Sequence, residues 1–328
     1  MISASNSLKD YCARGSSFPL NSDLTNNLPP AAAKERFFCS EGARLRGDPL
    51  AGTAPHGVVW VLIEYRGGWP LNGFDGLDLE PGTKAIVLSA AKAARARVLL
   101  VRRPGPRRRE GENHWAVLHH GNSGAYRQQW GTWSRDEDLA EIATALGTAG
   151  ELGHPPVILV CTHSQRDQCC AVWGRPVGRA LTERWPELVW ECSHVGGDRF
   201  AGNVVVAPDG VYYGNLSAEA SVATIEEHLA GRIHAEYLRG YTDLFPAQQA
   251  AVAATLARFG PAGRNDYVVA ATSRDGDYWR MRITGSPPHP TRLDVELQAR
   301  HAPPRQLTCR GPAMSSAVVY ELISIRAV

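Results

Sequence analysis

The sequence predicts an α/β protein with two similar units in tandem, followed by a smaller α+β region. Over the first two thirds of the chain, short apolar runs bounded by glycine or proline alternate with helical patterns, which is typical of buried strands joined by helices. In the last third, one helical pattern precedes runs that alternate like antiparallel strands. A chain of 328 residues is also too long for one ordinary core. We therefore expect an N-terminal extension (1–54), two α/β units (55–150 and 151–240) and a helix-plus-sheet appendix (241–328).

The N-terminal extension has little predicted structure. It is rich in Ser, Asn, Pro and Ala, and only the stretch 31–40 favours a short helix. Cys12 and Cys39 lie in this extension, and we interpret both as buried or bystander thiols rather than metal ligands.

The first α/β unit opens with the apolar run VVWVLIEY at 58–65, which predicts a strand buried on both faces. Glycines bound this run on either side. Downstream we expect a helix at 81–96, strands at 97–102, 115–119 and 126–133, and an amphipathic helix at 136–146.

The second α/β unit follows a linker of glycine and proline at 149–156. Within it, the Pro208-Asp209-Gly210 sequence predicts a hairpin turn. The similar order of elements in the two units is consistent with an ancient duplication. We expect a strand at 157–160 that ends at Cys161, a helix at 171–184, strands at 188–192, 204–207 and 211–213, and a helix at 217–238 that Gly231 interrupts.

The appendix begins with a predicted helix at 245–258. Cys309 stands alone in its sequence, and we interpret this thiol as structural. The pattern of the region does not indicate a function. Antiparallel strands are expected at 267–272, 279–283, 292–297 and 318–325.

Composition excludes several classes of partner. The formal net charge of +2 provides no global attraction to nucleic acid or to acidic membranes. The first residues show no basic start followed by an apolar run, so we expect no secretory signal, and no apolar run approaches the roughly 20 residues that cross a bilayer. We expect a cytoplasmic protein, where thiols stay reduced, so the seven cysteines are better suited to metal binding than to disulfides.

The stretch 157–216 concentrates side chains that bind metals. Soft and borderline ligands crowded at strand ends and tight turns favour a metal site over simple packing. The candidates are Cys161, His163, Cys169, Cys170, Cys192, His194 and Asp198.

Four of these candidates are expected to meet. Cys161 closes a buried strand, and Cys170 opens the following helix, where the positive end of the helix dipole favours a thiolate. His194 and Asp198 lie in a second loop, after the neighbouring strand. Because the two loops meet at one end of the sheet in a β-α-β unit, they predict a pocket with four ligands.

The types of ligand do not identify the metal. Two thiolates with an imidazole suit structural zinc, and they also suit a [2Fe–2S] cluster that has nitrogen ligands on one iron. The C-x2-C spacing that is common in zinc and ferredoxin sites is absent. A redox-active thiol pair would require C-x-x-C, for which the adjacent Cys169 and Cys170 are a poor substitute.

Several motifs in order resemble the sucrase/ferredoxin-like family of thioredoxin-like ferredoxins from fungi and bacteria. They are C-T-H-S-x-R-D-x-x-C, a G-R-P helix, H-x-G-G-x-R-F-A and P-D-G-x-Y-Y-G, all within 157–216. Weaker similarity, in A-G-T-A-P and RVLLVRRPG, extends into the first unit. The resemblance implies thioredoxin-like folds for the tandem units. No pair of carboxylates is patterned for glycoside hydrolysis, and we assign no catalytic residue.

The resemblance also implies a [2Fe–2S] cluster bound by two cysteines and two histidines. Carried over, Cys161 and Cys170 are the thiolate pair, Cys169 is a bystander, and His194 is the first histidine of the H-x-G-G-H motif. The second histidine is replaced by Asp198 in this chain. A carboxylate is a harder, negative ligand that lowers the reduction potential relative to imidazole.

Asp198 has alternatives as the fourth ligand. It is also placed to orient His194 without binding the metal, in which case Cys192, His163 or water completes the site.

These expectations favour a one-electron carrier that passes electrons between a reductase and an acceptor protein. The alternatives are a redox tailoring or detoxifying enzyme that uses the cluster, and a zinc-stabilised binding module. Neither nucleic acid nor a membrane is an expected partner, and the sequence does not indicate an oligomeric state.

Overall fold

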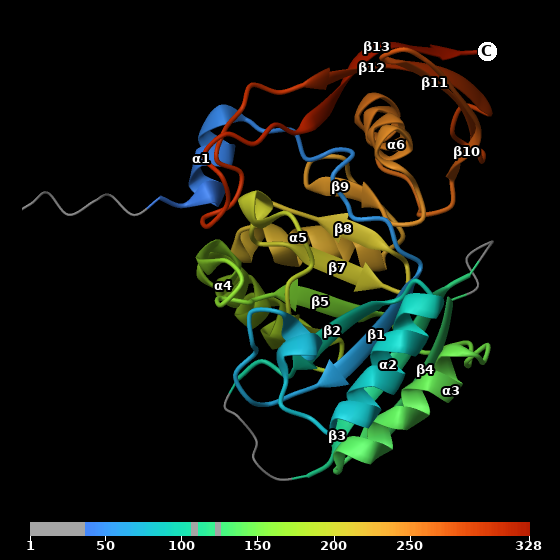
Figure 1. The fold of residues 1–328 in the computed structure, drawn as a ribbon. Coiled ribbons are helices and arrows are strands. Elements are labelled where there is room, and N and C mark those ends of the chain that lie inside the picture. Colours follow the sequence, from blue (N-terminus) through green and yellow to red (C-terminus); the bar gives the residue numbers. More distant parts are fainter. Residues whose placement is uncertain (1–36, 106–110, 122–125) are drawn as a thin grey trace, which may run out of the picture. The chain divides into compact units, whose positions relative to one another are not determined.

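The computed structural model describes residues 37–105, 111–121 and 126–328 (Figure 1). Strands from these residues form one mixed sheet of nine strands and one sheet of four strands. This confirms a mixed α/β protein. Within the described ranges, none of the helices has the length and apolar character needed to cross a membrane.

The first half of the large sheet has the strand order β4-β3-β1-β2. Strands β1 and β2 are parallel, and β3 pairs antiparallel with both β1 and β4. The predicted helix at 136–146 is a 3-10 turn, η3 (Asp136–Ala140), that continues as α3. The elements are β1 (Val59–Glu64), η1 (Gly73–Gly76), α2 (Pro81–Ala93), β2 (Arg97–Arg102), β3 (Asn113–His120), β4 (Tyr126–Trp133) and α3 (Glu141–Leu146).

The second half repeats this arrangement, with the order β8-β7-β5-β6 and β9 added beside β8. The predicted hairpin across Pro208-Asp209-Gly210 is confirmed, because β7 and β8 pair antiparallel there. The helix predicted at 217–238 is too long. It ends at Leu229, since Gly231 turns the chain with φ +77°, and the residues beyond form β9. The elements are β5 (Val157–Cys161), α4 (Gln168–Arg184), β6 (Val189–Cys192), η4 (Asp198–Phe200), β7 (Val204–Ala207), β8 (Val211–Tyr213), α5 (Ala218–Leu229) and β9 (Leu238–Tyr241).

A short antiparallel pairing of β2 with β6 joins the two halves into one sheet. Only Val101 with Cys192 and Arg102 with Glu191 are in register. Strands of the regions predicted as separate units therefore share one sheet. Side chains from both halves form one apolar cluster, to which β1 contributes Trp60, β5 contributes Leu159 and β8 contributes Tyr212, all fully buried.

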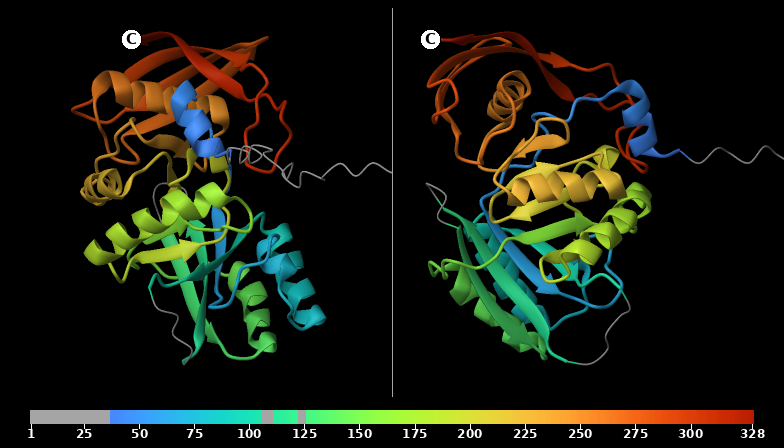
Figure 2. Two further views of the ribbon diagram at one scale, coloured as in Figure 1. Left: turned by 90° about the vertical axis from the view of Figure 1, so that its left-hand side faces the viewer. Right: turned by 180° about the vertical axis from the view of Figure 1, so that it is seen from behind.

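The C-terminal region is a four-stranded antiparallel sheet with its strands in chain order, as the alternating pattern predicts. Leu293, Val295 and Leu297 alternate along β12 and are buried in one cluster with α6, because side chains of a strand point alternately to its two faces. Figures 1 and 2 show α6 lying against this sheet. The elements are α6 (Pro246–Phe259), β10 (Tyr267–Asp275), β11 (Tyr278–Gly285), β12 (Arg292–His301) and β13 (Val318–Ala327).

Helix α1 (Cys39–Arg46) precedes the large sheet in the chain. The helix predicted at 31–40 overlaps it only at its end, and 31–36 lie outside the described residues, as does Cys12. In both views of Figure 2 and in Figure 1, α1 lies beside the loop that joins β12 to β13. A hydrogen bond of 3.4 Å from the Cys39 amide to Cys309 Sγ connects the two.

Candidate metal centre

Strand β5 delivers Cys161 to the edge of the sheet. The run Val157–Cys161 is buried throughout, so the strand is held on both faces and its last residue is rigidly placed. Strand β6 runs parallel to β5, and Cys192 is in register with Cys161. The loops that follow the two strands therefore leave the sheet at the same edge, as the sequence predicts.

Helix α4 brings Cys170 to the same edge. Asp167 caps the helix by accepting a hydrogen bond of 2.9 Å from the Cys169 amide, so the helix begins before the predicted Ala171 and includes Cys170. One turn later, Gly174 lets the helix touch the end of β5. A Cβ at position 174 would overlap the carbonyl oxygen of Cys161. The glycine of the G-R-P motif thus allows α4 to approach Cys161.

The ligand atoms of Cys161, Cys170 and His194 all lie within 4.8 Å of one another. Asp198 borders this trio, with Oδ1 3.0 Å from His194 Nδ1 and 3.4 Å from Cys170 Sγ. We call the four residues the central group. Both thiols are 1% exposed, whereas the His194 side chain is 22% exposed. The two predicted loops therefore meet, and the imidazole is the ligand-type group that faces solvent.

The central group stabilises a thiolate in a buried position. A hydrogen bond from Cys170 lowers the pKa of Cys161 well below the usual thiol value, and His194 adds to this effect against the cost of burial. Burial lowers the pKa of His194, but Asp198 and Cys161 outweigh burial and raise it to about 9. Burial raises the pKa of Asp198, and the hydrogen bond with His194 reverses this, so that the net shift is downward. An ionised thiol is the form that binds metals.

Arg239 on β9 holds the loop that carries His194, and sequence reasoning missed this residue. Its side chain is 1% exposed and donates hydrogen bonds of 2.8 Å to the Gly196 carbonyl and 2.8 Å to Asn203 Oδ1. It also donates to the Thr53 carbonyl at 2.6 Å. Gly197, with φ +78°, lies so close that a Cβ there would overlap the guanidinium. Arg239 and Gly196 are 43 residues apart in the sequence, and no motif around this single arginine predicts that the two are in contact.

The two alternative ligands occupy other positions. Cys192 is fully buried in β6 and, among the described residues, belongs to no group whose ligand atoms lie within 4.8 Å of one another. His163 accepts a hydrogen bond of 3.3 Å from the His194 amide through Nδ1. Its place is beside the central group, where it orients the His194 backbone.

Three cysteines outside the central group lie close together, and Cys39 is buried as the sequence predicts. The thiols of Cys39 and Cys169 are 3.7 Å apart, and those of Cys169 and Cys309 are 3.4 Å apart. Cys169 lies outside the central group but contacts Cys39 and Cys309, and Cys309, the one cysteine in the sequence 241–328, is close to two others in space. Residues far apart in the sequence meet here because α1 and the β12–β13 loop both reach the start of α4.

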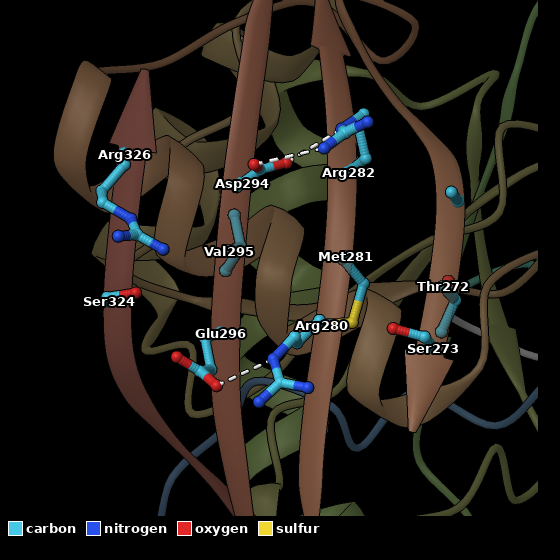
Figure 3. A pocket seen from close by; sticks show the side chains of 11 residues that line it. Thr272, Ser273, Arg280, Met281, Arg282, Asp294, Val295, Glu296, Ser324 and Arg326 are labelled. Carbon is cyan, nitrogen blue, oxygen red and sulfur yellow. Dashed lines mark hydrogen bonds and ion pairs between the residues drawn. The ribbon is translucent and has the colours of Figure 1, made fainter. Parts of the chain in front are cut away.

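Two hollows of similar size differ in chemistry. One, of about 350 Å³ on the four-stranded sheet, is lined by ion pairs between neighbouring strands, Arg280 with Glu296 and Arg282 with Asp294 (Figure 3). Its lining contains no cysteine or histidine. The other, of about 450 Å³, is lined by His163 among other residues and so lies beside the central group.

Comparison with known proteins identifies one family. The family model described as Sucrase/ferredoxin-like matches residues 50–240, which include the whole central group. No curated protein and no solved structure matches the chain.

Proposed function

Since the chain belongs to the sucrase/ferredoxin-like family, we propose that it binds a [2Fe–2S] cluster at the central group and acts as a one-electron carrier. The observation that supports this most strongly is the meeting of two buried thiols and an imidazole inside the region that the family model matches. When bound, the cluster supplies one-electron redox chemistry.

The donor set fits such a cluster. Cys161 and Cys170 are the soft ligands that iron–sulfur clusters take, and His194 and Asp198 are harder donors on the opposite loop. The charge on Asp198 replaces a neutral imidazole of the family motif, which favours a lower reduction potential. Thr162 and His163, next to Cys161, are both buried, so water reaches the thiols poorly.

The exposure of His194 supports docking of a redox partner over this side chain. Both thiols are shielded, and the imidazole is the ligand-type group nearest to solvent in the central group. A reductase and an acceptor protein that dock over His194 would come closest to the cluster. The six cysteines among the described residues are free thiols, which supports a reducing compartment such as the cytoplasm.

We further propose that both halves of the large sheet are thioredoxin-like. Each half consists of a β-α-β segment followed by two strands and a helix, with the β-α-β strands and the antiparallel pair in the same order. This repetition supports a duplicated unit of which only the second half carries the central group.

Two other functions each have one observation in their favour. The ligand atoms of Cys161, Cys170 and His194 are close enough for a single ion, which favours a zinc-stabilised binding module. The hollow of about 450 Å³ beside His163 favours an enzyme that holds a substrate next to the cluster.

Metal analysis of protein purified without oxygen tests the proposal. We expect visible absorption, two iron and two sulfide per chain, and loss of both in Cys170→Ser, with retention in the control Cys192→Ala. Colourless protein that holds zinc at the central group would refute the iron–sulfur assignment. Reduction and reoxidation by one electron per chain distinguish a carrier from a module without redox function.

A further inference from the structure

A second group of metal-binding side chains lies at the outer end of α4. It consists of Cys39, Asp167, Cys169 and Cys309, whose ligand atoms all lie within 4.8 Å of one another. We call it the peripheral group. Cys39 and Cys169 are fully buried and Asp167 is 1% exposed, whereas Cys309 is half-buried.

The spacing of the peripheral group matches one tetrahedral ion. Zinc–sulfur bonds of about 2.3 Å place the sulfur ligands of a tetrahedral site about 3.8 Å apart. Cys169 Sγ lies 3.7 Å from Cys39 Sγ and 3.4 Å from Cys309 Sγ. The carboxylate completes the set, since Asp167 Oδ2 is 3.7 Å from Cys39 Sγ. Three thiols and one carboxylate are thus close enough to one another to bind one zinc ion.

The backbone around the peripheral group favours negative ligands. Cys39 is the first residue of α1, and Asp167 is the N-cap of α4, so the positive ends of two helix dipoles point at the group. Asp167 accepts hydrogen bonds from the amides of Cys169, at 2.9 Å, and Cys309, at 2.8 Å. The Cys39 amide donates to Cys309 Sγ at 3.4 Å. Amide donors of this kind orient metal ligands and stabilise thiolates.

The peripheral group draws on three separate parts of the chain. Cys39 and Cys309 lie outside the matched range 50–240, before and after it, and only Asp167 and Cys169 lie within it. The group is therefore not part of the family's shared region. Cys169 and Cys170 are consecutive but belong to different groups, because successive residues of a helix point about 100° apart.

We propose that the peripheral group binds one zinc ion, which fastens α1 and the β12–β13 loop to the start of α4. The ion is separate from the centre proposed for electron transfer. Its positive charge would stabilise the two fully buried thiols, Cys39 and Cys169, and the buried Asp167 carboxylate in their ionised forms.

The position of this ion connects it to the central group. Helix α1 packs against η4, and Arg44 of α1 donates to the Ala201 carbonyl just after η4, at 2.5 Å. The turn η4 begins at Asp198, and α4 carries Cys170. By fastening α1 to α4, the ion would therefore stabilise the positions of Asp198 and Cys170.

Metal stoichiometry of the full-length protein tests the proposal. Zinc and iron are measured by mass spectrometry after expression with added zinc and purification without chelator. We expect Cys309→Ala and Cys39→Ala each to lose one zinc per chain relative to the wild type, with iron retained. Cys192→Ala, a buried thiol outside both groups, is the matched control and keeps the zinc. Cys170→Ser loses the metal of the central group and keeps this zinc, so failure of one proposal is distinguishable from failure of the other.

Alkylation provides a second readout that does not depend on a variant folding. We expect Cys39, Cys169 and Cys309 to resist iodoacetamide until a chelator is added, and then to be labelled without reductant. The proposal is overturned if the wild type lacks this zinc, if neither variant changes it, or if the metal lost is iron. It is also overturned if labelling requires a reductant, because the thiols would then form a disulfide.

Discussion

Substitution of Gly174 by alanine tests whether the contact between α4 and β5 assembles the central group. A Cβ at this position would overlap the carbonyl oxygen of Cys161 and lie 3.1 Å from its carbonyl carbon. An ordinary carbon–oxygen contact is about 3.3 Å or longer, so the helix must move by roughly 1 Å. Cys170 is one turn earlier on the same face of α4 and moves with it, whereas metal ligands tolerate displacements of only about 0.2 Å.

The control is Gly178→Ala, one turn further along the same helix. There a Cβ finds its nearest neighbour, Val160 Cγ1, at 3.8 Å, which is an ordinary contact. Alanine in place of glycine stabilises a helix by about 1 kcal/mol, so Gly178→Ala should gain this amount. In Gly174→Ala, overpacking costs about 1–3 kcal/mol and cancels or exceeds the same gain.

Urea unfolding and iron content measure the two effects. We expect Gly174→Ala to be less stable than Gly178→Ala by about 1–3 kcal/mol and to lose most of its iron, while Gly178→Ala retains iron. The reasoning is refuted if Gly174→Ala holds as much iron as the wild type and is as stable as the control.

Three further substitutions test single contacts. Asp198→His should shift the visible spectrum and raise the midpoint potential, since a neutral imidazole replaces a carboxylate; an unchanged spectrum and potential would place position 198 outside the ligand set. Arg239→Met should cost at least ~2 kcal/mol in urea unfolding, because it leaves the Gly196 carbonyl and the buried Asn203 amide without their donor, and iron retention should fall. If Arg239→Met were as stable as the wild type and held as much iron, Arg239 would not stabilise the loop that carries His194. Burial raises the pKa of Asp243, but the hydrogen bond with His120 and the charge of Arg264 outweigh burial and lower this pKa below its usual 3.8. The ionised carboxylate therefore stabilises the fold above pH 3.8, and this stabilisation is lost as the pH falls through the lowered pKa. Asp243→Asn should therefore be less stable by about 1–3 kcal/mol at neutral pH, with the difference vanishing in acid; a gap that persists at pH 2 would argue against this linkage.

The central group was predictable because its signals are local. Cys161 ends an apolar run, Cys170 opens a helical pattern, and His194 follows the next strand, so the β-α-β connection alone brings their loops to one edge. The expected strands of the appendix appear for a similar reason, since an alternation of apolar residues is visible within each run.

Local patterns in the sequence did not predict the pairing of β9 with β8 or the hydrogen bonds of Arg239 to the loop that carries His194. Residues 230–241 carry no apolar alternation long enough to indicate a strand, and the helical pattern before them masks the true end at Leu229. Arg239 acquires its role only because β9 pairs with β8 and points the guanidinium into the loop after β6.

The sequence by itself determined the mixed α/β class, the family region and the approach of Cys161, Cys170 and His194, because each depends on periodicity and on neighbours along the chain. Only the tertiary structure decided that Cys39, Cys169 and Cys309 form a group. Their side chains lie 130 and 140 residues apart in the sequence, and no local pattern connects them. The physical reason is that contact between distant segments depends on how α1 and the β12–β13 loop pack on α4, which is a property of the folded chain as a whole.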